Sequence, residues 1–350
     1  MRSTQFEVPT VDLAPYVRGG TTADKAEVAR ALDEACRTVG FIQIVGHDVP
    51  ETAIHGLRDA LDDFFALTLE DKKKYVRPVA ENRGYSPPKS ESLSYSLGVD
   101  SVTRMNDFFE AFNVGTSSAE YPDAGVSAED YPESVWPQEL TAFRPQVETY
   151  FSEARRVART LTEAFADALG VEHERLASLM DHSLDVMRMN NYALPPGEIE
   201  LEGELTGMGE HTDFGLVTVL WADQVAGLQV LGADGGWHDV SPTDGALLVN
   251  LGDVAARLTN DVWMSTLHRV KPPVIDGVIK RRRSVAFFHD GNADAIIETI
   301  PSFVPAGEEA LYEPVSVKDH VEAKLNGSRA GQKNTRATRE AARVIAAADS

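Results

Sequence analysis

Hydrophobic residues recur at helical spacing in three stretches of the first half of the chain. In residues 23–38 they form one stripe, and Thr22 can cap the start of the predicted helix. A second stretch, from about Glu51 to Phe65, repeats this pattern. The longest helix is predicted from about Pro145 to Leu169, with Gly170 as its stop, and its apolar stripe fits a scaffold that packs against a sheet.

The second half of the chain changes to short apolar segments between turns. Strand-like runs of four to eight residues follow one another from about Asp185 to Phe303, and GADGG at Gly232 to Gly236 indicates a hairpin. An earlier run, FIQIV at residues 41–45, also predicts a strand. We therefore predict a mainly β fold with flanking helices: a double-stranded β-helix (jelly-roll) core, an N-terminal α/β region and a long scaffold helix.

We expect one folded unit made of four successive regions. They are an N-terminal helical and strand region that packs on the core (residues 1–135), scaffold helices (136–180), the jelly-roll core (181–305), and a C-terminal helix and tail (306–350). Residues 85–135 are rich in Ser, Pro, Asp and Gly and predict loops that could border a site. Lys72 to Lys74 are predicted to be a solvated face. The tail from Gly327 could be a helix, a lid or disordered, and the sequence does not choose among these.

A polar pair in the second half gives the strongest chemical signal. His211 and Asp213 lie two positions apart, just before the apolar run Leu216 to Leu220, and residues two apart on a strand point to the same face. His268 could be delivered by another strand of the same β-structure. Two imidazoles and one carboxylate are the ligand set of non-heme Fe(II) oxygenases, which keep the other coordination positions for substrate and O₂. The pattern indicates an enzyme that activates oxygen.

Such spacings also arise by chance in an acidic chain with several histidines. His320 and Glu322 are two apart as well, but Val317, Val321 and Leu325 recur every four residues and predict a helix. Residues two apart do not face each other on a helix, so we reject this pair as a chelate. Taken alone, the first pair could equally be a polar strand end with a turn-capping Asp.

A second signal lies in the segment RRRSVAFF. Arg282 and Ser284 share one face of another predicted strand. Because a buried guanidinium needs an anion and can hold a carboxylate by two parallel hydrogen bonds, this pair is a candidate anchor for the far end of a dicarboxylate. Lys280 and Arg281 fit a solvated run at the strand end, and alternation places Arg283 on the face opposite to Arg282.

With these motifs the chain resembles the iron(II)- and 2-oxoglutarate-dependent dioxygenases, specifically the isopenicillin N synthase-like branch. The motifs occur in the family's order and cover most of residues 5–305. They are VPTVDLAPY from Val8, GFIQIVGHDVP from Gly40, RGYSPP from Arg83, HTDFG from His211, GLQV from Gly227, LLVNLGD from Leu247, TND from Thr259, STLHRV from Ser265 and the Arg282-x-Ser284 pair.

The resemblance implies roles for the residues of both signals. His211, Asp213 and His268 would bind Fe(II), and Arg282 with Ser284 would bind the distal carboxylate of 2-oxoglutarate. Oxygen would be the third reactant. These assignments give one metal centre with a cosubstrate site beside it.

Two further residues match the family in the segment RMNNYALPPG, Arg188 to Gly197. There, family members supply a Tyr and sometimes an Asn to the other end of the cosubstrate, and Tyr192 and Asn190 match those positions. A strand Tyr that only packs its ring, with its hydroxyl at the rim, is nearly as good an interpretation. This chain has Ala193 and Leu194 where plant members have Pro and Cys, which leaves the local backbone open.

Composition limits the classes of molecule that we expect the protein to bind. The net charge of −22 argues against nucleic acid or an anionic membrane surface and favours a small-molecule substrate. Cys36 is the only cysteine, which excludes an intramolecular disulfide and argues against Fe–S or zinc-thiolate sites. The N-terminus has no apolar targeting stretch, and no apolar run approaches the ~20 residues that span a bilayer, so we expect a cytoplasmic protein.

Three functions compete at this point. The leading one is an oxygenase that couples oxidative decarboxylation of 2-oxoglutarate, to succinate and CO₂, to hydroxylation, desaturation or cyclisation of a small organic substrate. A relative of isopenicillin N synthase would bind iron without that cosubstrate, and the Arg-x-Ser pair does not decide between them. A non-catalytic jelly roll that holds a metal for stability and binds a small ligand is the third.

The sequence leaves the substrate and the oligomeric state open. An amino acid, a peptide or an apolar secondary metabolite would each be compatible with it. His289 and Asp290 are predicted at the pocket rim, and a structural role fits them equally well. Four aromatic residues could belong to the core or line a pocket: Phe108, Phe109, Phe287 and Phe288.

Overall fold

Two facing sheets form the centre of the molecule. The structure, a computed structural model, describes residues 6–88, 90–91, 93–97, 109–193, 207–272, 274–275, 278–330, 334 and 339. The larger sheet has the strand order β1 (Thr10–Asp12), β2 (Phe41–Val45), β10 (Leu247–Leu251), β7 (Val217–Ala222), β14 (Arg282–His289), β5 (Val186–Tyr192), β4 (Glu110–Gly115) and β3 (Gly84–Ser86). The smaller has the order β6 (Met208–His211), β11 (His268–Val270), β8 (Leu228–Leu231) and β9 (Trp237–Asp239).

Neighbouring strands in both sheets are antiparallel, apart from the parallel pair β1 and β2. The expected mainly β fold with a double-stranded β-helix core is therefore confirmed, and so is the hairpin at Gly232 to Gly236, which joins β8 to β9. Two short ribbons lie outside the sheets: β12 (Val274–Ile275) with β13 (Val278–Ile279), and β15 (Ile296–Ile297) with β16 (Val315–Ser316).

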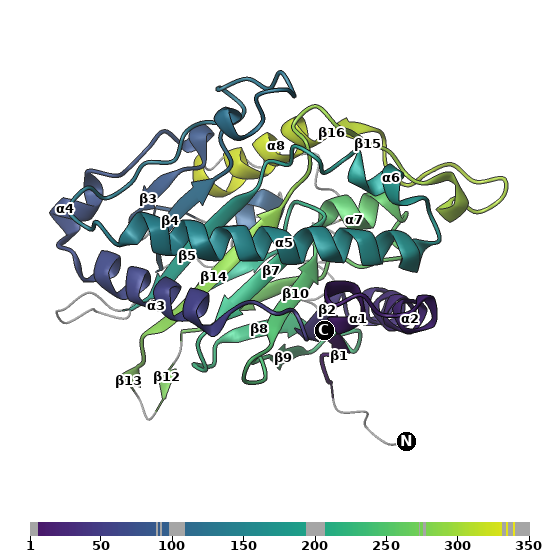
Figure 1. Cartoon of the computed structure of the whole chain (residues 1–350), viewed down its shortest axis with the longest axis horizontal. Coiled ribbons are helices and arrows are strands. Elements are labelled where there is room, and N and C mark those ends of the chain that lie inside the picture. Colours follow the sequence, from purple (N-terminus) through teal and green to yellow (C-terminus); the bar gives the residue numbers. More distant parts are fainter. Residues whose placement is uncertain are drawn as a thin grey trace.

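Helices cover one face of the larger sheet (Figure 1). The long helix α5 crosses that face, with α3 and α2 beside it. The helices are α1 (Ala14–Val17), α2 (Thr22–Thr38), α3 (Glu51–Ala66), α4 (Leu69–Lys73), α5 (Phe143–Leu169), α6 (His173–Ala177), α7 (Asp253–Leu258) and α8 (Val317–Ala330). Short 3₁₀ helices are η1 (Val79–Glu81), η2 (Leu93–Leu97), η3 (Ser118–Glu120) and η4 (Pro301–Phe303).

Two hydrophobic cores follow from this layering. The larger core lies between the helices and the sheet, where Phe151 of α5 meets Phe287 of β14 edge to face at 5.1 Å. The smaller core lies between the two sheets and includes Phe109 and Tyr192. Phe109 and Phe287 are thus core residues, whereas Phe108 lies outside the described part of the chain.

Three local predictions were wrong. Thr21, not Thr22, caps α2, because the Thr21 side chain accepts a hydrogen bond from the Asp24 amide while the Asp24 carboxylate accepts one from the Thr21 amide. Lys72 is buried rather than solvated, since its Nζ donates to Glu110 Oε2 at 2.7 Å. Glu110 itself begins β4, an inner strand of the sheet within the stretch predicted as loops, and its buried polar residues hide the strand pattern.

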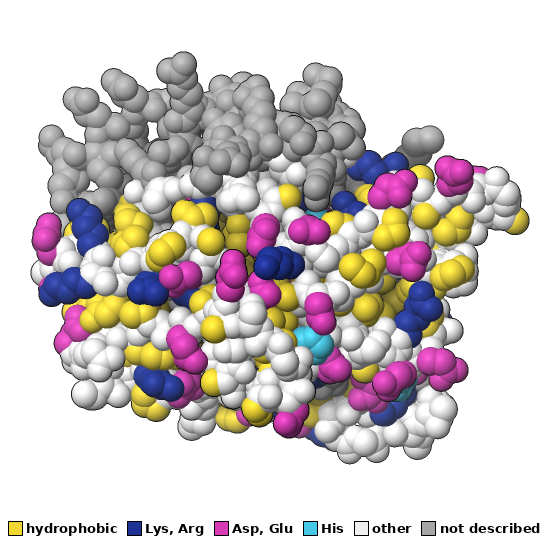
Figure 2. All heavy atoms as spheres, turned by 90° about the horizontal axis from the view of Figure 1, so that it is seen from above, with side chains coloured by type: hydrophobic (Ala, Val, Ile, Leu, Met, Phe, Trp, Pro, Cys, Tyr) yellow, Lys and Arg dark blue, Asp and Glu magenta, His cyan; other side chains and the backbone are white. Residues whose placement is uncertain are grey.

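The described surface carries mixed charge. On the face seen in Figure 2, acidic and basic side chains are interspersed with hydrophobic ones rather than gathered into one patch. Among the described helices, none combines the length and the apolar character that crossing a membrane requires.

Candidate metal centre and adjoining cavity

Three buried side chains converge between the sheets. His211 ends β6 and His268 begins the neighbouring strand β11, where the two residues are directly paired. Asp213 Oδ1 lies 4.0 Å from His211 Nε2 and 3.7 Å from His268 Nε2. One ligand atom from each residue lies within 4.8 Å of the others, and no other trio of His, Cys, Asp or Glu in the described ranges does this. The arrangement is that of a facial metal site with two nitrogens and one oxygen.

Asp213 reaches this position by a route that differs from the predicted one. We expected His211 and Asp213 on one strand, but β6 ends at His211, and the chain then passes to β7 in the other sheet. Asp213 lies in this crossover, where its carbonyl accepts a hydrogen bond from the Asp253 amide at 2.9 Å. The two side chains therefore converge because of the crossover and not because of strand alternation.

The two imidazoles are oriented by backbone carbonyls. His211 Nδ1 lies 2.8 Å from the Gly209 carbonyl oxygen, and His268 Nδ1 lies 3.1 Å from that of Thr266. Since a carbonyl only accepts, each Nδ1 carries the proton and each Nε2 keeps its lone pair for the cluster. Burial, reinforced by the neighbouring His268, lowers the pKa of His211 to about 3. The imidazole is thus held neutral, which is the form that binds metals.

The Asp213 carboxylate is fixed through its other oxygen. Oδ2 accepts hydrogen bonds from Thr218 Oγ1 at 2.5 Å and from Asn250 Nδ2 at 2.6 Å, which leaves Oδ1 directed at the imidazoles. Thr218 lies on β7 and Asn250 on β10, directly paired across the larger sheet. Such outer partners orient a metal-binding carboxylate, so the residues present fit a divalent ion of the iron type.

A buried ion pair lies behind this cluster. Lys324 of α8 is fully buried, and its Nζ lies 2.7 Å from Asp253 Oδ2 and 3.1 Å from Thr212 Oγ1. Although burial alone would raise it, Lys324 holds the pKa of Asp253 below its usual range. His320, also on α8, has its pKa lowered to about 4 by burial. Helix α8 is therefore attached to the segment between His211 and Asp213 by one charged side chain.

Lys324→Met is expected to destabilise the protein by about 3–5 kcal/mol, because it leaves the Asp253 carboxylate buried without a cation. His320 Nε2 lies 3.6 Å from the same carboxylate, but burial of this imidazole lowers its pKa and so opposes its serving as the missing cation. Urea unfolding monitored by circular dichroism measures the change. Lys318→Met is the matched control, because Lys318 lies on the same helix but pairs with Asp130 at the surface. Equal effects of the two substitutions would contradict the role of the buried pair.

The metal cluster opens onto a cavity between the two sheets. The cavity holds about 920 Å³ of space free of protein atoms, part of it open to solvent, and every residue predicted for metal or cosubstrate binding lines it. Along β14 and β5, Arg282 pairs with Tyr192, Ser284 with Asn190, Ala286 with Arg188 and Phe288 with Val186.

Arg282 lies at one end of this series, and no carboxylate of the described residues pairs with it. Its side chain is buried, and neither Nε nor Nη1 has a hydrogen-bond partner within the described residues. The guanidinium lies over the Tyr192 ring, 5.2 Å from its centroid. A buried cation without a counter-ion is costly, so an acidic group of a ligand fits here. Asn190 instead has its Oδ1 engaged by Arg188 Nε at 3.1 Å.

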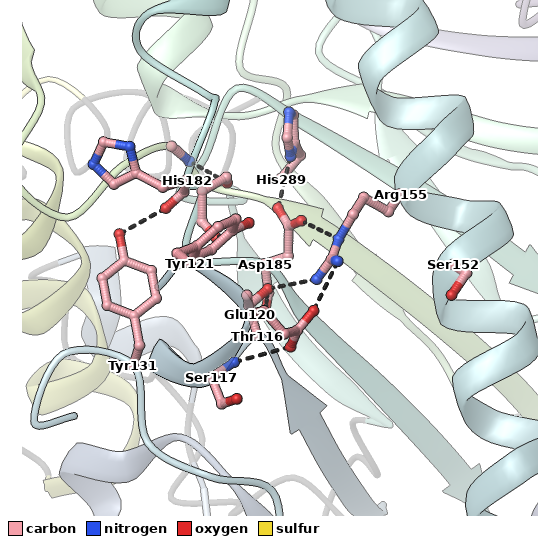
Figure 3. Close-up of polar contacts among 12 residues, drawn as sticks. Thr116, Ser117, Glu120, Tyr121, Tyr131, Ser152, Arg155, His182, Asp185 and His289 are labelled. Atoms are coloured by element: carbon pink, nitrogen blue, oxygen red, sulfur yellow. Dashed lines mark hydrogen bonds and ion pairs between the residues drawn. The ribbon is translucent and has the colours of Figure 1, made fainter. Parts of the chain in front are cut away.

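His289, the last residue of β14, and Asp290, which follows it, have different surroundings. His289 does not line the cavity; it is fully buried on the α5 side, and its Nδ1 lies 2.7 Å from Asp185 Oδ1. Arg155 of α5 donates to the same carboxylate and to Glu120 (Figure 3), so the rim prediction is wrong for His289 and a structural role applies. Asp290 does line the cavity, and burial raises its pKa well above the usual range.

Several cavity residues were missed by the sequence prediction. Thr218 and Asn250 lie in the quoted strand and motif segments, but nothing in their identity marks them as partners of a carboxylate. Glu91, Arg188 and Arg329 come from three distant segments, and only the fold brings them together in the cavity. Glu91 does belong to the loop region that was expected to border a site. Of the RMNNYALPPG segment, residues 194–197 lie outside the described ranges.

Most of the chain is similar to proteins of known family. Two family models match: the N-terminal model of a non-haem dioxygenase in morphine synthesis, over residues 8–139, and the 2OG-Fe(II) oxygenase superfamily, over residues 184–291. The 2-oxoglutarate-Fe(II) type oxidoreductase hxnY of Emericella nidulans is 33% identical over 318 residues, covering 89% of this chain and 88% of that protein. Validamycin A dioxygenase of Streptomyces hygroscopicus subsp. limoneus is 32% identical, covering 90% and 84%.

Solved structures are similar over nearly the whole chain. A full-length Neurospora crassa protein in complex with alpha-KG (2-oxoglutarate) and thymine matches with a TM-score of 0.78 and 26% identity, covering 93% of this chain and 98% of that one. The same protein with alpha-KG alone matches with a TM-score of 0.76.

Proposed function

Because the chain belongs to the 2OG-Fe(II) oxygenase superfamily, we propose that His211, Asp213 and His268 bind its Fe(II) and that Arg282 and Ser284 bind the distal carboxylate of 2-oxoglutarate. The protein is an oxidoreductase that uses Fe(II), 2-oxoglutarate and O₂ on a small organic substrate. When bound, Fe(II) would activate O₂, and 2-oxoglutarate would be the reductant that is oxidised to succinate and CO₂; together they would supply the oxidant that hydroxylates, desaturates or cyclises the substrate.

One observation carries this assignment of residues. The only trio of candidate ligand atoms found in the described ranges lines the same cavity as a buried guanidinium whose Nε and Nη1 have no partner there. A dicarboxylate can satisfy both, with one end at the metal and the other at Arg282. A site for the metal alone would not require the second cation.

The chain's own residues hold and orient the reactants. Thr218 and Asn250 fix the Asp213 carboxylate, and the carbonyls of Gly209 and Thr266 fix the two imidazoles. We assign Tyr192 and Asn190 to the cosubstrate site with Arg282, since Tyr192 and Asn190 pair with Arg282 and Ser284 across β5 and β14. Apolar side chains along the cavity, such as Leu220 and Leu228, exclude water from the reacting centre.

The proposal also covers the branch of the family, the class of partner and the location in the cell. The order of the motifs supports the isopenicillin N synthase-like branch, and we place the protein in secondary metabolism. The charge of −22 supports a small-molecule substrate over nucleic acid or an anionic membrane surface. A cytoplasmic location fits the single cysteine, which can form no intramolecular disulfide.

Release of CO₂ from labelled 2-oxoglutarate tests the function directly. Protein reconstituted anaerobically with Fe(II) and then exposed to O₂ is expected to release CO₂ and succinate in equal amounts, and a primary substrate is expected to stimulate the release. Omission of Fe(II) should abolish it. Substrate oxidation that proceeds without 2-oxoglutarate would instead favour an oxidase, and metal-dependent melting without any O₂ consumption would favour a non-catalytic metal protein.

A further inference from the structure

A second group of buried charges lies in the cavity, apart from Arg282. Arg188 of β5, Arg329 of α8 and Glu91 all line it, and their side chains are 8%, 10% and 5% exposed. Arg188 Nη2 lies 3.0 Å from Glu91 Oε2, and Arg329 Nε lies 3.4 Å from Glu91 Oε1. Two guanidinium groups thus share one carboxylate.

Polar neighbours hold Arg188 in place. Its Nε donates to Asn190 Oδ1 at 3.1 Å, its Nη1 donates to Asn113 Oδ1 at 3.4 Å, and its guanidinium lies 5.1 Å from the centroid of the Phe109 ring. Arg188 Nη2 and Arg329 Nε approach Glu91 without hydrogen-bond geometry, and neither has another hydrogen-bond partner in the described ranges. Both arginines thus have Glu91 as their one shared anion, and two guanidinium groups on a single carboxylate keep N–H capacity for a second anion.

The charges do not balance within this cluster. Although burial opposes its ionisation, Arg188 and Arg329 lower the pKa of Glu91 to about 2, so Glu91 carries one negative charge at neutral pH. The two arginines carry two positive charges, which leaves one in excess. Fe(II) and 2-oxoglutarate do not remove this excess positive charge. The two negative charges of 2-oxoglutarate balance the two positive charges of Fe(II), and the negative charge of Asp213 balances the positive charge of Arg282.

We propose that Arg188 and Arg329 recognise the carboxylate of the primary substrate, which is therefore a small organic acid with one negative charge. This inference rests on the proposed function and gives the substrate class for the same cavity. Glu91 holds the two guanidinium groups in place, and the substrate's acid group supplies the anion that they lack.

Strand register indicates where the rest of the substrate lies. Arg188 pairs with Ala286 across β5 and β14, while Thr218, which holds Asp213, pairs with Phe288 on the other side of β14. Two strand spacings, roughly 10 Å, therefore separate the backbone of Arg188 from that of Thr218, the residue that holds the metal cluster's Asp213. Between them the cavity is lined by Ala286, Phe288 and Leu220. The acid group and the oxidised carbon are thus several bonds apart, with an apolar body between them.

Matched pairs of acids and amides test this recognition. Protein loaded anaerobically with Fe(II) and 2-oxoglutarate is titrated by calorimetry with phenylacetate and phenylacetamide, cyclohexanecarboxylate and its amide, and hexanoate and hexanamide. Because charge-assisted hydrogen bonds contribute about 1.5–3 kcal/mol, the best acid should bind roughly 10–100-fold more tightly than its amide. A wild-type protein that binds no acid more tightly than its amide overturns the proposal.

Three variants test which residues cause the preference for acids over amides. Arg329→Gln should reduce the ratio of acid to amide affinity to near one. Glu91→Gln keeps both guanidinium groups and removes the competing carboxylate, so the ratio should stay or rise even if α8 is loosened. Arg339→Gln is the matched control, because Arg339 pairs with Asp261 at the surface, and its ratio should equal that of the wild type. A ratio unchanged in Arg329→Gln, or lowered equally in all three variants, overturns the proposal.

The same samples separate this inference from the proposed function. Binding of 2-oxoglutarate is followed by the visible absorbance of its anaerobic Fe(II) complex. If no complex forms, the assignment of the metal and cosubstrate sites fails. If the complex forms and acids and amides bind equally, only the recognition by Arg188 and Arg329 fails.

Discussion

Asp213→Ala is expected to abolish turnover and to weaken Fe(II) binding by more than roughly 100-fold, while the protein stays folded. The substitution removes the only carboxylate of the cluster and leaves two imidazoles. The loss should exceed the ~10–100-fold that removal of an outer partner of a metal ligand costs. Equilibrium dialysis of Fe(II) under anaerobic conditions measures the affinity, and thermal melting followed by circular dichroism measures the fold.

Thr218→Val supplies the graded control for this variant. It removes one hydrogen bond from Asp213 Oδ2 and leaves the one from Asn250. Fe(II) affinity should therefore fall by about 10–100-fold, less than in Asp213→Ala. If Asp213→Ala melts at a much lower temperature and the folded fraction still binds Fe(II) normally, Asp213 has a structural role and is not a ligand.

Arg282→Lys should raise the apparent KM for 2-oxoglutarate by roughly 10–100-fold and change kcat much less. A lysine keeps the charge but cannot form the two parallel hydrogen bonds of a guanidinium with a carboxylate, and the lost hydrogen bonding corresponds to about 1.5–3 kcal/mol. Steady-state rates of CO₂ release, measured over a range of 2-oxoglutarate concentrations, give both constants.

The adjacent arginine gives a matched comparison. Arg283 is on the same strand but faces away from the cavity, where it pairs with Asp62 and Asp223. Arg283→Lys should leave the KM for 2-oxoglutarate unchanged. Should Arg282→Lys also leave it unchanged, Arg282 would be removed from the cosubstrate site.

Local patterns predicted most of the helices and strands because they depend on near neighbours. The apolar stripe and Gly170 placed α5 within two residues at its start and correctly at its end, where Gly170 adopts φ 65°. Two of the local predictions that were wrong each depended on a single polar contact. Thr21 caps α2 in place of Thr22 because the Thr21 hydroxyl is the one that accepts the hydrogen bond from the Asp24 amide. The burial of Lys72 depends on Glu110, 38 positions away.

The candidate site also has one part that local sequence patterns predict and another part that only the folded structure brings together. The residues predicted for metal and cosubstrate lie together in one cavity because their motifs are short and chemically distinctive. Asp213 reaches the cluster through a crossover that strand alternation could not predict. Glu91, Arg188 and Arg329 carry no local signal, since their relation exists only after β5, α8 and the segment before η2 have packed together.

The buried pair of Lys324 and Asp253 has a consequence for the order of events on the ribosome. Chains emerge from the N-terminus, so every strand of both sheets is synthesised before α8. Until α8 docks, Asp253 has no cation and the segment from His211 to Asp213 has no support on that side. A nascent chain arrested before Lys324 should therefore contain both sheets and yet fail to capture iron tightly, which delays metal loading until synthesis has passed this helix.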